Sequence, residues 1–151
     1  MAKNVFQKEE TGPAGPAGAT ATNENAMLYN TAGQTVTAGD NLDFAASQIN
    51  STGSIAASGT NGLSLTPGQY LVSFKTDAVN AAVGNLGVSL ALDGTALPYA
   101  ISLIASPAAE PQSLMLTAVL DLAAAQTLTV INSSGDTNSY SNSTLSLVKL
   151  A

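Results

Sequence analysis

The sequence predicts an all-β protein, a two-sheet jelly-roll sandwich of about eight to ten strands preceded by a short collagen-like segment. From residue 26 onward, alternating apolar and polar residues form short runs, separated by Gly, Asn, Asp and Pro roughly every eight to twelve residues. This alternation outweighs any helical period in the same region. Glycine occupies every third position from Gly12 to Gly18, which is the collagen pattern.

The chain begins with a leader and a spacer. Residues 1–11, MAKNVFQKEET, are polar apart from one apolar pair, Val5 and Phe6. Residues 12–20 form three Gly-X-Y triplets, whose glycines and prolines are Gly12, Pro13, Gly15, Pro16 and Gly18. Only glycine fits at the axis of a triple helix, so this pattern predicts a homotrimer. A loose Pro/Gly linker is the alternative, and either form would span roughly 28 Å as polyproline II.

Residues 21–151 are expected to form the head domain. AMLYNTAG (26–33) predicts its first strand, and GQTVTAGDNLDF (33–44) predicts a short strand, a turn and an apolar anchor at Phe44. A further strand is expected at GSIAAS (53–58).

In GLSLTPGQYLVSFKTDA (62–78), the Pro-Gly pair predicts a turn between two strands. After that turn, Tyr70, Val72 and Phe74 share one face of a strand, because successive side chains alternate between the two faces.

The second half of the head contains the clearest hairpin. In NLGVSLALDGTALPYAISL (85–103), Asp93-Gly94 is a type I′ turn signal between two alternating runs. Residues 112–132 predict two strands, since alternation favours a strand over a helix at Leu114, Leu116, Ala118, Leu120 and Leu122. STLSLVKL (143–150) predicts the last strand.

Composition argues against several functions. The net charge is −6 and charged residues make up only 9% of the chain, so neither nucleic acid nor an anionic membrane is an expected partner. Without His or Cys, the chain lacks the commonest general base and the thiol nucleophile. We therefore expect a protein that is not an enzyme, with no catalytic residues, no metal site and no cofactor.

Two polar features leave alternatives open. Asp40 and Asp43 could contact a hard cation, although capping of their own turn explains them better. Tyr140 and residues 132–143 could form an exposed recognition tip, or simply a surface loop.

The order of several segments resembles a known family. A Gly-Pro-Ala stretch precedes AMLYNTAGQTVTAGDNLDF, LTPGQYLVSFKTD, SLALDGTALPYA and a terminal STLSLVKLA. This order is similar to the collagen-like exosporium glycoproteins of spore-forming bacteria, over roughly residues 12–151. The resemblance implies a TNF-like trimeric jelly-roll head without enzymatic activity, which nucleates a collagen stalk. It also suggests O-glycans at Thr11, Thr20 or Thr22.

Two departures from that family refine the expectation. The collagen-like segment has only three triplets, and the leader is short. Both fit a compact subunit of a spore-surface appendage fibre, in which Val5 and Phe6 dock on the next trimer in a head-to-tail filament.

The expected partners are then further copies of the chain, an exosporium anchoring protein and a tip protein. Because residues 1–10 lack the apolar core of a signal peptide, release by mother-cell lysis onto the spore surface is expected. The alternative function is a trimeric receptor- or glycan-binding head of a spore-surface or phage fibre.

Overall fold

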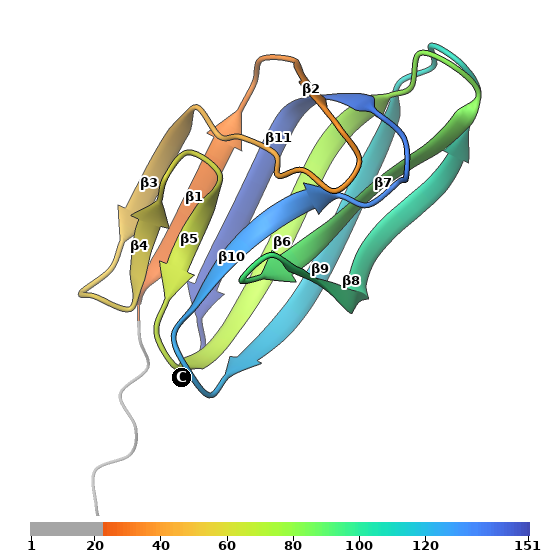
Figure 1. The fold of residues 1–151 in the computed structure, drawn as a ribbon. Coiled ribbons are helices and arrows are strands. Elements are labelled where there is room, and N and C mark those ends of the chain that lie inside the picture. The colour runs from red at the N-terminus through yellow and green to blue at the C-terminus, as the bar shows by residue number, and fades with distance from the viewer. Residues whose placement is uncertain (1–22) are drawn as a thin grey trace, which may run out of the picture.

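The computed structural model describes residues 23–151, which form a sandwich of two antiparallel sheets (Figure 1). The strands are β1 (Asn25–Asn30), β2 (Gln34–Val36), β3 (Ala46–Asn50), β4 (Ile55–Ser58), β5 (Gly62–Leu65), β6 (Gly68–Val79), β7 (Gly84–Leu92), β8 (Thr95–Ser106), β9 (Gln112–Leu122), β10 (Gln126–Asn132) and β11 (Asn138–Lys149). Within these residues there is no helix, which confirms the all-β prediction. The short β3 was not predicted from the sequence.

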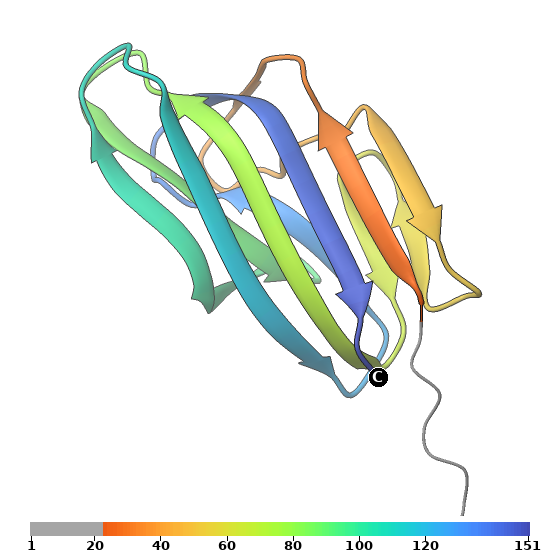
Figure 2. The same cartoon turned by 180° about the vertical axis from the view of Figure 1, so that it is seen from behind.

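The two sheets are built from strands that are distant in sequence. The six-stranded sheet has the order β3-β1-β11-β6-β9, with β2 beside β11, and Figure 2 shows these strands side by side. The five-stranded sheet has the order β4-β5-β10-β7-β8. Because β5 and β6, and likewise β9 and β10, lie in different sheets, the chain crosses repeatedly between the layers, as in a jelly roll.

The core lies between the sheets, where the alternating residues meet. Tyr70, Val72 and Phe74 of β6 are buried as predicted, and so are the five alternating residues of β9. Those residues pair with β6 in one continuous register, which confirms that this segment is a strand. Phe44 packs edge-on against Phe74 with ring centroids 6.4 Å apart, and so acts as the predicted apolar anchor.

The predicted hairpin is formed by β7 and β8. Asp93 and Gly94 have φ angles of 48° and 79°, as both central residues of a type I′ turn require. The register shifts beyond the turn. Ala91 pairs with Ala96 and Ser89 pairs with Ile101, so Leu90 alone lies opposite the four β8 residues 97–100. This large bulge was not predicted from the sequence.

The two ends of the sandwich differ. The backbone N–H of Gln69 donates to the carbonyl oxygen of Ala151, so the C-terminus lies beside the start of β6. The chain also enters β1 at this end, which we call the base (Figures 1 and 2). The opposite end, the apex, carries the loops at 80–83, 107–111 and 133–137.

Candidate assembly surfaces

Of the two acidic residues singled out from the sequence, Asp43 bonds neighbouring segments through its carboxylate and its backbone, whereas Asp40 does so through its backbone. The Asp43 carboxylate accepts a hydrogen bond from Thr60 Oγ1 at 3.1 Å. The backbone N–H of Asp43 donates to Gln34 Oε1, and its carbonyl oxygen accepts from Gln34 Nε2. Asp40 donates its backbone N–H to Thr37 O at 3.1 Å, closing a turn. Within residues 23–151, no three acidic side chains are grouped so that they could hold a metal ion. No helix in this range could cross a membrane either.

Both alternatives left open for Tyr140, an exposed recognition tip and a surface loop, are wrong, because Tyr140 lies within β11. Tyr140 is only 1% exposed, and its hydroxyl donates to Gly87 O at 2.9 Å. The physical reason is that the last strand begins at Asn138, five residues earlier than predicted, so alternation directs Tyr140 into the core. Burial raises the pKa of the Tyr140 hydroxyl. The loop itself is limited to residues 133–137.

The outer face of the six-stranded sheet changes character from base to apex. Near the base, Leu71 of β6 lies between Val119 of β9 and Val148 of β11 in the cross-strand register. These three residues, which we call the base patch, are between 38% and 56% exposed. Directly opposed side chains on one sheet face contact each other, so the base patch is continuous across three strands.

Towards the apex the outward positions of β6 become polar, although Met115 of β9, opposite Lys75, is 70% exposed. Moving along β6 by two residues at a time, the outward positions after Leu71 are Ser73, Lys75 and Asp77. The Asp77 carboxylate accepts hydrogen bonds from Asn142 Nδ2 at 2.9 Å and Ser113 Oγ at 2.8 Å. These two bonds, together with the nearby Lys75 ammonium, lower the pKa of Asp77.

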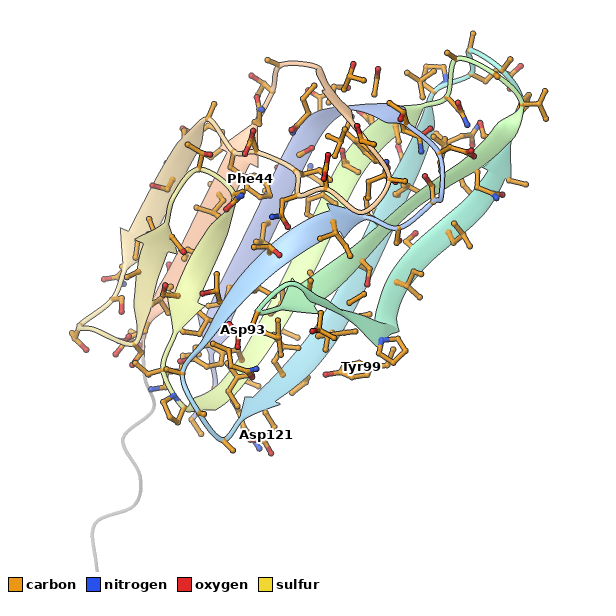
Figure 3. The ribbon with its side chains drawn as sticks, viewed as in Figure 1. Phe44, Asp93, Tyr99 and Asp121 are labelled. Carbon is orange, nitrogen blue, oxygen red and sulfur yellow. The ribbon has the colours of Figure 1, made fainter. Side chains whose placement is uncertain are left out.

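A second apolar surface lies on β8, the edge strand of the five-stranded sheet. Tyr99, Ile101 and Leu103, which we call the edge patch, are between 46% and 64% exposed. Tyr99 lies within the bulge and projects from the β8 edge (Figure 3). The Ser89 hydroxyl lies within 3.3 Å of the carbonyl oxygens of Leu90, Leu97 and Ala100, and so supports the bulged backbone from β7.

A hydrogen-bonded clasp holds the chain where it enters the head. The Glu24 carboxylate accepts hydrogen bonds from Ser51 Oγ at 2.5 Å, from Thr52 Oγ1 at 2.7 Å, and from the N–H and hydroxyl of Ser54. The bonds to Ser51 and Thr52 contribute most to lowering the pKa of Glu24 to about 2. Sequence reasoning did not find this clasp, although the hydroxyl-rich STGS (51–54) was a signal for it.

The predicted docking residues Val5 and Phe6 lie outside the described residues. The same holds for the predicted collagen-like positions Gly12, Pro13, Gly15, Pro16 and Gly18.

A scan against protein-family models finds no match, and neither does a search of curated proteins. Solved structures do match. The chain is similar to Eiger TNF from S. frugiperda, with 19% identity and a TM-score of 0.66 over 86% of this chain and 94% of that one. Murine APRIL matches with 15% identity and a TM-score of 0.64, over 85% of this chain and 100% of its own.

The globular domain of zebrafish complement 1qA matches with 13% identity and a TM-score of 0.62, over 83% of this chain and 95% of that domain. The head therefore has the jelly-roll fold of TNF and complement 1q, as the resemblance implied.

Proposed function

We propose that this chain is a non-enzymatic structural subunit. Its heads associate as a homotrimer, and the trimers stack head-to-tail through the leader into a spore-surface fibre. The trimer is supported by the two exposed apolar patches on the head. The fibre and its location are supported by the resemblance to exosporium proteins and by the short spacer and leader.

The observation that carries the trimer is the position of the two patches on different surfaces. The base patch lies on the face of one sheet, whereas the edge patch lies on the edge strand of the other. Contact between the base patch of one copy and the edge patch of the next is a heterologous interface, which closes into a ring when the rotation between copies allows it. A collagen-like spacer of three chains requires a ring of three.

Low charge on these surfaces makes the contact favourable. The base patch contains three aliphatic residues, and the outward positions on its apex side, Ser73, Thr117 and Ser146, are uncharged. On its base side Gln69 faces Asp121, which places one charge at the rim of the patch. Burial of the three aliphatic side chains releases hydrophobic free energy, and no charge lies within the patch itself.

The oligomeric state of the whole chain tests this proposal. The wild type should sediment as trimers, of three times 15.0 kDa, or as stacks of such trimers. We expect Leu71→Glu to sediment as a single chain of 15.0 kDa, because the substitution places a charge at the centre of the base patch. Analytical ultracentrifugation measures the mass. The matched control is Ser64→Glu, which adds the same charge to an exposed position of β5 in the other sheet. A trimer that persisted in Leu71→Glu would contradict the proposed interface.

A binding head is the second candidate. A groove of about 510 Å³ on the outer face of the six-stranded sheet is lined by Met27 and by several hydrogen-bonding side chains, among them Tyr29, Gln48 and Asn142. Such side chains suit a glycan. A protein that stopped at a soluble trimer and bound defined glycans on an array would favour this candidate over the fibre subunit.

A further inference from the structure

A small pocket lies on the outer face of the six-stranded sheet, at the apex. It forms where the end of β6 and the first residues of β11 meet the loops before β2 and β9, and its volume is about 260 Å³. Its walls include Gly33, Val79, Pro111, Ser139 and Ser141. We call it the apex pocket.

The apex pocket suits one apolar side chain better than a free ligand. Its volume is below the roughly 300–1,000 Å³ of most small-molecule sites, yet a cavity of about 150 Å³ already accepts benzene. Val79 and Pro111 supply apolar walls. Asp77 also lines the pocket, but its carboxylate is bonded to Asn142 and Ser113 and is therefore partly satisfied.

The described head buries two of the three Phe residues in the chain. Phe44 and Phe74 are buried against each other, and the third is Phe6 in the leader. Phe6 follows Val5 in a leader that is otherwise mostly polar. Full burial of such a ring is strongly favourable.

The position of the pocket indicates that it receives the leader of another copy. The chain enters the head at the base, whereas the pocket lies at the apex, about 40 Å away along the twelve residues of β6. A triple-helical spacer would direct its leader away from its own head. In a head-to-tail stack, the trimer that follows on the base side presents its apex to that leader.

We propose that the apex pocket of one trimer holds Phe6 of the next trimer in the fibre. This inference rests on the proposed function and names the receptor for the leader. Three pockets around one trimer would receive the three leaders of its neighbour, and the second and third dockings are intramolecular.

Two full-chain variants test each side of the contact. Phe6→Ala removes the docked ring, and Val79→Glu places a charge in the pocket. We expect each variant to form trimers and to raise the critical concentration for fibre assembly by roughly tenfold or more, since burial of one Phe accounts for at least that factor. Val83→Glu is the matched control, because Val83 is 82% exposed in the apex loop between β6 and β7 and does not line the pocket. It should assemble as the wild type does.

A mixing experiment makes the test directional. Trimers of Phe6→Ala keep intact pockets, and trimers of Val79→Glu keep intact leaders. Mixed after separate purification, they should form pairs of trimers near six times 15.0 kDa and stop there, because the remaining leader and pocket of each pair are disabled. Sedimentation of each variant alone and of the mixture gives the answer.

The outcomes separate the two proposals. If Phe6→Ala prevents fibres but Val79→Glu does not, the apex pocket is not the receptor and leader docking stands. If Phe6→Ala leaves the fibres unchanged, the leader docking of the proposed function is wrong and this inference is wrong with it. A wild-type protein that remains a single trimer overturns the fibre itself.

Discussion

At the scale of single residues, short-range sequence signals identified the buried side chains better than the polar contacts. Alternation correctly assigned Tyr70, Val72 and Phe74 to the core. The same reasoning, applied to a strand assumed to start at residue 143, left Tyr140 in a loop. Glu24 and its hydroxyl partners are separated by about thirty residues, and no local pattern brings them together.

Glu24 leads to a prediction about pH. The pKa of its carboxyl falls from 4.5 to about 2 in the folded head, so the folded state binds this proton more weakly than the unfolded state does. The clasp therefore stabilises the head fully above pH 4.5, and this stabilisation is lost as the pH falls towards about 2.

We expect the wild type to have a higher Tm than Glu24→Gln at neutral pH, with a difference that shrinks through this acidic range. Thermal denaturation of both proteins as a function of pH measures the difference. A Tm difference that stayed constant down to pH 2 would show that the ionised carboxylate does not stabilise the head.

At the scale of elements, the residues of the β7–β8 turn predicted the turn itself but not the bulge that follows it. Asp93-Gly94 correctly predicted the turn, because both residues must adopt positive φ angles. The Asp93 carboxylate also accepts a hydrogen bond from the Thr127 N–H at 2.8 Å, which ties the turn to β10. The bulge that exposes Tyr99 was missed, since it depends on the Ser89 hydroxyl of the opposite strand.

The hairpin turn gives a stability prediction. Gly94 has a φ of 79°, so Gly94→Ala should lower the free energy of unfolding by about 1–2 kcal/mol through backbone strain. Chemical denaturation measures the change. Gly33→Ala is the matched control, because Gly33 does not have a positive φ and nothing lies within 4 Å of the added Cβ. Equal effects of the two substitutions would show that the left-handed conformation is not the cause.

At the scale of the whole molecule, the surface pattern depends on the order of the strands. Leu71, Val119 and Val148 come from three distant segments, and they meet because β6 lies between β9 and β11. The apex pocket likewise combines loops and strand ends that are far apart in sequence. Neither surface could be found from alternation, which indicates only that each residue faces outward.

The proposed fibre has a predictable axial repeat. The head is about 40 Å long, from twelve residues of β6 in extended conformation, and the nine-residue spacer adds about 28 Å as polyproline II. We therefore expect a repeat of roughly 70 Å in electron micrographs of the assembled protein. A repeat near 40 Å would mean that the spacer does not separate successive heads and would contradict its extended form.

The sequence by itself determined the all-β class, the position of most strands, the inward faces of β6 and β9, and the turn between β7 and β8. These properties depend on residues close together in the chain, through alternation and through the φ angles that a turn requires. Only the tertiary structure decided which outward residues become neighbours, where Tyr140 points, and what holds Glu24. Those properties depend on pairing between strands far apart in the chain, and the physical reason is that local preferences do not encode the register of such pairs.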